Sequence, residues 1–161
     1  MSLGLYLHIP YCFSKCRYCD FYSHPGERGV PDAYVEALVR ELDRFAPERP
    51  LQPDTLYFGG GTPSLLRPEQ AKRLIDAARP LPGAEITLEA NPETVTEQSL
   101  AGFREAGVNR ISFGVQSARD TQLRTLGRPH TAKQARAAFA AARRAGFANI
   151  SGDIMLALPH Y

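Results

Sequence analysis

The chain has 161 residues, of which 43% are hydrophobic and 22% are charged, and its formal net charge is +2. This length and composition predict a single globular domain with a buried core rather than a disordered or fibrous chain. The small net charge gives no argument for a nucleic-acid partner. No apolar run approaches the roughly 20 residues that are needed to span a bilayer.

Strand and helix patterns alternate along the chain. The expected strands are residues 3–9, 55–58, 85–90, 108–115 and 149–156, because each is a short apolar run between turn-forming or polar residues. The expected helices are residues 31–45, 68–78, 96–107 and 131–146, where apolar side chains recur at helical spacing. This alternation predicts an α/β fold with a parallel sheet and right-handed crossovers.

Several helix boundaries can be read from end-specific residues. Pro31 suits the first turn of the first helix, and Pro47 would end it. Thr96 is the expected N-cap of the third helix, and Gly107 the residue that follows its last turn. Thr131 begins a capping-box pattern at the fourth helix. The expected apolar face of the first helix comprises Tyr34, Leu38, Leu42 and Phe45.

All three cysteines of the chain, Cys12, Cys16 and Cys19, lie directly after the first expected strand. Three thiolates can converge on one metal centre, but they cannot fill a four-coordinate site. A [4Fe–4S] cluster bound by them would keep one iron open for a small molecule, which favours a cofactor-handling role. The spacing alone leaves two alternatives open: unrelated buried thiols, or a zinc site completed by His8 or His24. The odd count argues against a disulfide framework.

The N-terminus lacks the basic segment and the uninterrupted apolar segment of a secretory signal. We therefore expect a reducing, cytoplasmic location, which suits a labile cluster.

Polar and glycine residues recur where the expected strands end. They are Gly59–Thr62, Glu89, Asn91, Gln116 and Asp153. Since the carboxyl ends of parallel strands share one edge of a sheet, we expect these residues to form a site together with the cysteines. A glycine run of this kind is more often a turn than a ligand loop, although its backbone N–H groups could approach a ligand.

Other residues carry a weaker signal. Gln116 or Arg128, taken alone, is read more simply as a structural residue that satisfies a loop or caps a helix. The stretch Arg136–Arg144 is most simply a solvated helix face. His130 and His160 carry no readable signal.

A set of motifs then occurs in a fixed order along the chain. They are Tyr6-Leu-His-Ile-Pro-Tyr-Cys12, Cys19-Asp-Phe-Tyr22, Gly59-Gly-Gly-Thr-Pro-Ser64, Glu89-Ala-Asn-Pro-Glu93, Gly107-Val-Asn-Arg-Ile-Ser-Phe-Gly-Val-Gln-Ser117, Leu126-Gly-Arg128 with His130, and Asn149-Ile-Ser-Gly-Asp-Ile-Met155. Together they resemble the oxygen-independent coproporphyrinogen III oxidase group of the radical S-adenosylmethionine (SAM) superfamily. The resemblance covers nearly the whole chain.

The resemblance implies a ligand set. Cys12, Cys16 and Cys19 would bind a [4Fe–4S] cluster, whose open iron is chelated by the amino and carboxylate groups of SAM. The residues around SAM would be Tyr6, Tyr18, Gly60, Gly61, Thr62, Glu89, Gln116, Arg128 and Asp153. Glu89 would accept a hydrogen bond from the SAM ammonium, Arg128 would face its carboxylate, and the Gly60 backbone would meet its amino group. No single residue is assigned as catalytic.

Within this group, the chain most resembles the heme chaperones of the HemW family. The true oxidases carry a further cysteine two residues after the third cluster cysteine, where this chain has Phe21. The resemblance implies heme or a porphyrin as a partner, and flavodoxin or ferredoxin as the electron donor. Two alternatives stay open, namely an oxidase that decarboxylates porphyrinogen propionates with a 5′-deoxyadenosyl radical, and a non-catalytic truncated or zinc-binding module.

The resemblance also implies a partial TIM-type (βα)6 barrel that stops here after about the fifth parallel strand. We expect residues 1–161 to be the N-terminal part of the radical SAM core domain. The resemblance implies that the C-terminal heme-chaperone region, with its His-Asn-x-x-Tyr-Trp segment, is absent from these residues, and the chain has no Trp. We therefore do not expect these residues alone to bind heme. Without a covering helix, the last strand should expose an apolar edge.

Overall fold

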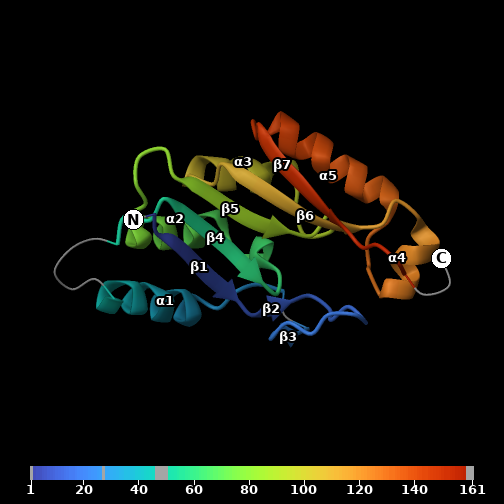
Figure 1. The fold of residues 1–161 in the computed structure, drawn as a ribbon, viewed down its shortest axis with the longest axis horizontal. Helices are drawn as coiled ribbons and strands as arrows, with labels where there is room; N and C mark the ends of the chain where they lie inside the picture. Colours follow the sequence, from blue (N-terminus) through green and yellow to red (C-terminus); the bar gives the residue numbers. More distant parts are fainter. Residues whose placement is uncertain (1, 27, 46–50, 159–161) are drawn as a thin grey trace.

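A computed structural model describes residues 2–26, 28–45 and 51–158 of the chain. Its centre is a parallel sheet with the strand order β1-β4-β5-β6-β7. The strands are β1 (Gly4–Ile9), β4 (Thr55–Gly60), β5 (Glu85–Ala90), β6 (Arg110–Gln116) and β7 (Asn149–Ile154). Because each strand pairs in parallel with its neighbour, all of their carboxyl ends lie along one edge (Figure 1).

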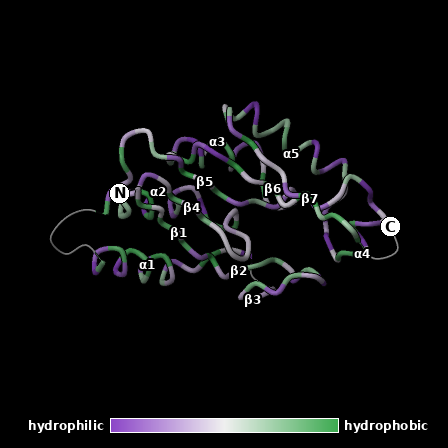
Figure 2. The backbone as a smooth tube through the Cα atoms, viewed as in Figure 1, coloured by the Kyte–Doolittle hydropathy of each residue, from purple (hydrophilic) through white to green (hydrophobic). Residues whose placement is uncertain are grey.

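Helices follow the strands and cover one face of this sheet (Figure 1). They are α1 (Asp32–Phe45), α2 (Pro68–Ala78), α3 (Glu97–Ala106) and α5 (Ala132–Arg144). The short α4 (Asp120–Leu126) lies instead beyond the carboxyl edge of the sheet (Figure 1). Contacts run from α1 to α2, from α2 to α3 and from α3 to α5, so these four form a continuous layer. Hydrophobic and hydrophilic residues recur turn by turn along α1 and α5, as expected for helices with one buried side (Figure 2).

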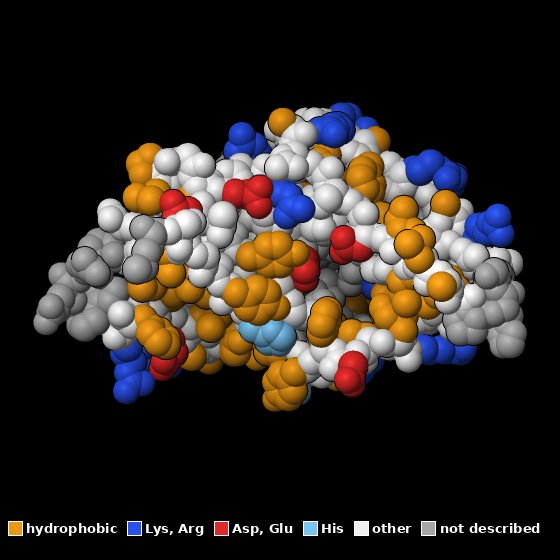
Figure 3. All heavy atoms as spheres, viewed as in Figure 1, with side chains coloured by type: hydrophobic (Ala, Val, Ile, Leu, Met, Phe, Trp, Pro, Cys, Tyr) orange, Lys and Arg blue, Asp and Glu red, His pale blue; other side chains and the backbone are white. Residues whose placement is uncertain are grey.

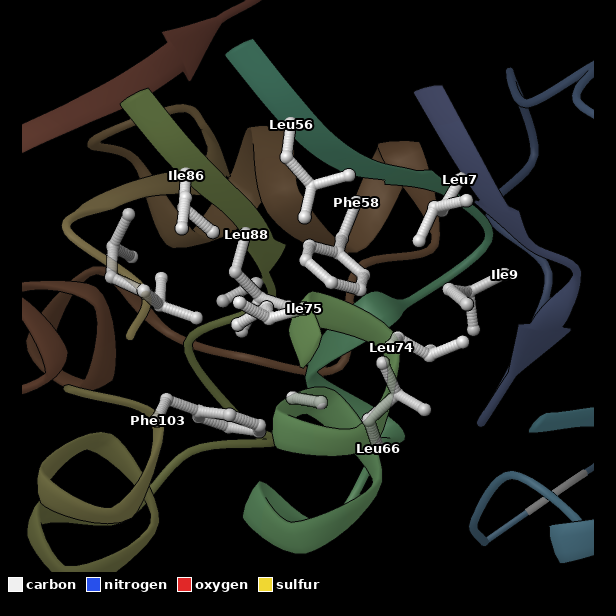
Figure 4. Packing of buried hydrophobic residues seen from close by; sticks show 14 of the residues in the cluster. Leu7, Ile9, Leu56, Phe58, Leu66, Leu74, Ile75, Ile86, Leu88 and Phe103 are labelled. Atoms are coloured by element: carbon white, nitrogen blue, oxygen red, sulfur yellow. The ribbon is translucent and has the colours of Figure 1, made fainter. Parts of the chain in front are cut away.

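The core lies between the sheet and this helix layer. Successive side chains of a strand point to opposite faces, so every second residue faces the helices. In Figure 4, apolar side chains of β1, β4 and β5 point toward those of α2 and α3. The labelled core residues are Leu7, Ile9, Leu56, Phe58, Leu66, Leu74, Ile75, Ile86, Leu88 and Phe103.

The alternate residues of the same strands form an opposite, polar face. They include Tyr57, Thr87, Glu89, Ser112, Ser151 and Asp153. Arg110 bridges three strands on this face, since its guanidinium donates to Thr87 Oγ1 at 3.2 Å and to Ser151 Oγ at 3.1 Å. The described helices leave this face largely uncovered.

Several expectations from the sequence are confirmed closely. The helix over 68–78 and the strand over 85–90 have the predicted bounds. Thr96 caps α3 by accepting a hydrogen bond from Ser99 N at 3.1 Å, and Thr131 caps α5 in the same way. Gly107 ends α3 with φ 113°, a left-handed conformation that glycine adopts at little cost.

The expected apolar face of α1 is partly wrong. Val35 and Leu42 are the buried residues of this helix, whereas Phe45 is 76% exposed. Tyr34 and Leu38 are partly buried and pack against the core, whereas Phe45 is the last helical residue. Pro47, the expected end signal, lies outside the described residues.

Four strands differ in length from the prediction. β1 begins at Gly4 rather than residue 3, and β4 continues to Gly60 rather than ending at residue 58. β6 begins at Arg110 rather than residue 108, because the preceding Asn109 uses its side chain to bridge Ile86 N and Ala84 O, both at 2.8 Å. β7 ends at Ile154 rather than residue 156. The exposed Ile154 and Leu156 agree with the expected apolar edge at the last strand.

Four short elements were not predicted. They are α4, which is seven residues long, the 3-10 helix η1 (Pro63–Leu65), and the strands β2 (Tyr11–Cys12) and β3 (His24–Pro25), which pair with each other. These elements have too few residues for a periodic pattern to appear. They nevertheless define the surroundings of the cysteines.

Candidate functional site

The cysteine segment is held at both ends by backbone contacts. Cys12 lies in β2, opposite Pro25 of β3, and is buried. Cys16 and Cys19 lie beyond β2 and are half-buried; Cys19 N donates to Cys16 O at 3.1 Å, which closes a tight turn. Arg17 N donates to Leu126 O of α4 at 3.1 Å. The three free thiols are therefore presented by a short loop that rests on α4.

The glycine run brings the end of β4 against this segment. A Cβ on Gly61 would lie 2.6 Å from Tyr11 O and 3.0 Å from Cys12 Sγ. A Cβ on Gly60, where φ is 112°, would lie 2.6 Å from the His8 ring. Both separations are too short for a side chain, so close packing requires glycine here.

The N–H groups of this run are already used inside the protein. Gly61 N donates to Ile9 O at 2.9 Å, and Thr62 N donates to Tyr11 O at 2.8 Å. Gly60 N donates to Glu89 Oε2 at 3.2 Å. In this structure strand and loop acceptors thus satisfy the N–H groups of all three residues, and a contact of these groups with a ligand stays a prediction.

Glu89 projects from β5 onto the polar face. Its carboxylate accepts hydrogen bonds from the Tyr57 hydroxyl at 2.7 Å and from Gly60 N. Burial raises the pKa of Glu89, and the nearby Asp153 adds to that rise, although the hydrogen bonds from Tyr57 and Gly60 oppose it. A third donor, especially a cation, would therefore be favoured beside this carboxylate.

Arg128 joins the cysteine segment to the edge of the sheet. Its guanidinium donates to Cys16 Sγ at 3.3 Å, to Asn91 Oδ1 at 2.7 Å and to Gly114 O at 2.8 Å. Burial acts to lower the pKa of Arg128, but the Glu93 carboxylate and Cys16 outweigh it and the pKa is raised. Among the described residues, its buried Nε has no hydrogen-bond partner.

Asn91 and Thr62 complete a polar chain that reaches a second cysteine. Asn91 Nδ2 donates to Thr62 Oγ1 at 3.1 Å, and the Thr62 hydroxyl donates to Cys12 Sγ at 3.5 Å. Cys12 and Cys16 are thus both hydrogen-bonded to the edge of the sheet. Hydrogen bonds to sulfur are one way in which proteins tune bound metal centres.

One cavity brings nearly all of the expected site residues together. Its lining includes the three cysteines and, of the residues expected around SAM, Tyr18, Gly60, Gly61, Thr62, Glu89, Gln116, Arg128 and Asp153. Figure 3 shows acidic side chains and a histidine around a hollow in the middle of this face, with hydrophobic side chains on both sides. Burial raises the pKa of Tyr18 to about 12, so its phenol stays neutral beside the thiols.

Tyr6 is the expected site residue that does not line this cavity. It is 54% exposed, its ring stacks on Tyr57, and its hydroxyl lies 3.3 Å from His8 Nδ1. Gln116, in contrast, lies at the cavity with φ 65°. The backbone at the end of β6 turns there, where the pairing with β7 shifts register.

The sequence left two polar side chains without a role. Asn91, recognised only as a residue at a strand end, bonds directly to Arg128. His130 is buried and contacts Glu93 and Val115 O. The proline that follows Asn91 restricts the backbone at Asn91 and could have indicated a side chain held in one position. No sequence pattern predicted the burial of His130.

Two further features of the described residues bear on the site. No three His, Cys, Asp or Glu side chains in that part of the chain converge on the position of a single metal ion. In an iron–sulfur cube the thiolates bind separate irons, so such convergence is not what a cluster requires. Among the described helices, none has both the length and the apolar composition to cross a bilayer.

The chain is similar to a known family and to several known proteins. Residues 6–161 match the model of the Radical SAM superfamily. The chain is 44% identical to the heme chaperone HemW of Escherichia coli K12, over 98% of this chain and 43% of that protein, and 40% identical to HemW of Bacillus subtilis 168, over 96% and 42%. It therefore spans less than half the length of these relatives.

The solved structure of the E. coli radical SAM enzyme coproporphyrinogen III oxidase, HemN, superposes with a TM-score of 0.88 at 31% identity. The match covers 99% of this chain and 38% of the oxidase. This likeness confirms the α/β fold and the part of a radical SAM barrel that the sequence predicted.

Proposed function

The chain belongs to the radical SAM superfamily, and from that premise we propose that it binds a [4Fe–4S] cluster through Cys12, Cys16 and Cys19, with SAM beside it. The observation that carries the proposal is the shared cavity. Three thiols, the buried Glu89 carboxylate and the Arg128 guanidinium all line it. A set of three thiolates leaves one iron of such a cluster for a ligand other than protein.

The residues at the cavity fit these groups. Gly60 and Gly61 keep side chains out of the space between β4 and the cysteine segment. The buried Nε of Arg128, without a partner among the described residues, gives a donor for an incoming carboxylate. On this reading, Glu89 accepts from the SAM ammonium and Arg128 faces the SAM carboxylate.

The remaining expected contacts are proposed on the same basis. Gln116 and Asp153 lie near the ends of β6 and β7 and line the cavity, which supports their proposed place around SAM. Tyr18 and Thr62 close the cavity beside the cysteines. When bound and reduced, the cluster supplies one electron to SAM.

For the whole protein we propose the role of a cytoplasmic heme chaperone, with residues 1–161 as the N-terminal part of its radical SAM core. The support comes from the relatives named heme chaperone HemW and from Phe21, at a position where the oxidases carry cysteine. In this role heme or a porphyrin is the partner, and a flavodoxin or ferredoxin is the electron donor.

An oxygen-independent coproporphyrinogen III oxidase is the second candidate. The close superposition on such an oxidase favours it. An assay on the whole protein distinguishes the two candidates. An oxidase consumes coproporphyrinogen III under anaerobic conditions with SAM and a reductant. A chaperone binds heme and transfers it without consuming the porphyrinogen.

The first experiment uses this chain under anaerobic conditions. Iron and sulfide are added, the cluster is reduced with dithionite, and the EPR spectrum is recorded before and after SAM is added. We expect a reduced [4Fe–4S] signal that changes with SAM. A cluster signal without a SAM response would contradict the proposed SAM site, and zinc retained without sulfide would support the zinc-binding alternative instead.

A further inference from the structure

His130 is a fully buried histidine close to the candidate site. It lies in the connection between α4 and α5, two residues after Arg128, and the exposed fraction of its side chain is 0%. Both ring nitrogens have partners: Nδ1 lies 3.1 Å from Glu93 Oε2, and Nε2 lies 3.1 Å from Val115 O. Burying a polar ring costs free energy unless it is hydrogen-bonded, so these two contacts fix where the ring can lie.

The chemistry of the partners indicates which ring nitrogen can donate. A backbone carbonyl can only accept, so the tautomer with its hydrogen on Nε2 is the one that can donate to Val115 O. Nδ1 faces the Glu93 carboxylate, with 3.1 Å between Nδ1 and Oε2. Val115 O also accepts from Ser117 N at 2.8 Å. His130 is therefore attached to the turn at the end of β6 and to the connection between β5 and α3.

This attachment fixes the segment that carries Arg128. On the other side of Arg128, Gly127 ends α4 with φ 73° and packs on Arg17 of the cysteine segment. The segment is thus held before and after Arg128. The Glu93 carboxylate, which contacts the His130 ring, is the largest of the charges that raise the pKa of Arg128.

Arg128 in turn contacts a sulfur expected to bind the cluster. One of its N–H groups donates to Cys16 Sγ at 3.3 Å. A hydrogen bond or a positive charge at a cluster sulfur stabilises the reduced, more negative cluster and raises its reduction potential. The geometry of Arg128 is therefore expected to affect the potential, and His130 and Glu93 fix that geometry.

We propose that Glu93 and His130 are a positioning pair that holds the Arg128 guanidinium on Cys16 and thereby raises the reduction potential of the bound cluster. The part that concerns the cluster rests on the proposed function. The part that concerns the pair and Arg128 rests only on the contacts in the protein.

A double-mutant cycle tests the proposal through the potential. The midpoint potential is measured by EPR-monitored redox titration for the wild type, His130→Phe, Arg128→Gln and the double variant. We expect each single variant to shift the potential to more negative values, and His130→Phe to add little in the Arg128→Gln background. Arg136→Gln, an exposed arginine on α5, is the matched charge control and should leave the potential unchanged.

Two results would overturn the proposal. One is an unchanged potential in His130→Phe; the other is the same shift in both backgrounds, which would mean that His130 acts independently of Arg128. If His130→Phe does not fold, Glu93→Gln replaces it in the cycle. That variant retains an oxygen acceptor, and we expect a smaller shift in the same direction.

A second measurement does not depend on the cluster. In the metal-free chain with ¹⁵N-labelled histidine, we expect the Nε2 hydrogen of His130 to exchange with water slowly, and that of the exposed His24 quickly. Glu93→Gln should speed the exchange at His130 only. Fast exchange at His130 in the wild type would overturn the pair. Slow exchange in a chain that assembles no cluster would support the pair while contradicting the proposed function.

Discussion

The two faces of the sheet are made from the same strands but have opposite chemistry. On one face, residues such as Phe58 and Leu88 are fully buried against α2 and α3. On the other, the adjacent Tyr57 and Glu89 form a hydrogen-bonded pair at the edge of an open cavity. The alternation of side chains along a strand produces both faces at once.

Most of the stability comes from the helix-covered face, whereas the groups available to a ligand lie on the polar face. Burial of apolar side chains is the main favourable term in folding, and it is concentrated on the helix-covered face. Buried or half-buried charges such as Glu89 and Arg128 contribute little to stability but leave hydrogen-bonding capacity for a ligand. Substitutions on the two faces should therefore affect different measurements.

The largest effect is expected at the cysteine segment. Cys16→Ser should abolish the cluster EPR signal and its iron content, because two thiolates would remain. The half-buried position means that the unfolding free energy of the metal-free chain should change by less than about 0.5 kcal/mol. Ser14→Ala, in the same loop, is the control and should retain the signal. A cluster signal of normal intensity in Cys16→Ser would remove that thiol from the ligand set.

The largest effect on stability is expected on the helix-covered face. Phe103 is 0% exposed, and Phe103→Ala should lower the unfolding free energy by about 3–5 kcal/mol, through lost burial and the cavity left behind. Chemical denaturation followed by circular dichroism measures it. Phe21→Ala, at a side chain that is 65% exposed, should cost less than about 0.5 kcal/mol. Equal costs at the two positions would contradict the comparison.

Glu89→Gln should separate ligand binding from stability on the polar face. Removal of the charge that would accept from an ammonium should weaken the SAM response of the cluster by about tenfold or more, or about 1.4 kcal/mol. The cluster signal without SAM should persist. If SAM binding is unaffected, Glu89 is not a ligand of the SAM ammonium.

The raised pKa of Glu89 also predicts how the difference in unfolding free energy between the wild type and Glu89→Gln depends on pH. The folded state binds the Glu89 proton more tightly than the unfolded state, so wild-type stability from this group is present at low pH and lost as pH rises through the raised pKa. Glutamine does not titrate. The unfolding free energy of the metal-free wild type should therefore rise relative to Glu89→Gln when the pH is lowered from 7.5 to 5. The opposite trend would mean that the hydrogen bonds from Tyr57 and Gly60 outweigh burial.

The smallest effect is expected at the end of a helix in the covering layer. Thr96→Ala removes the acceptor for Ser99 N and should lower the unfolding free energy by about 1 kcal/mol. Thr96→Ser keeps the hydroxyl and should recover most of the loss. Neither variant should alter the EPR response to SAM. A change in that response would show that the helix layer and the cavity are coupled.

The sequence predicted the elements whose signals are local. The strand over 85–90, the helix over 68–78 and the caps Thr96 and Thr131 follow from periodicity and capping, which need only neighbouring residues. It also placed the cysteines and Glu89 at one edge, since parallel strands bring their carboxyl ends together. The expected burial of Phe45 was wrong, because periodicity does not indicate where along a helix the packing against the core ends.

Tertiary structure decided the contacts that join distant segments. The hydrogen bond from Arg128 to Cys16 joins residues 112 positions apart, and the burial of His130 needs the ends of β5 and β6 as its partners. Only the fold revealed that the glycine N–H groups are already satisfied and that Tyr6 lies outside the cavity. The chemical groups of the site were thus determined by the sequence, whereas their partners depend on distances that only the packed sheet and helices fix.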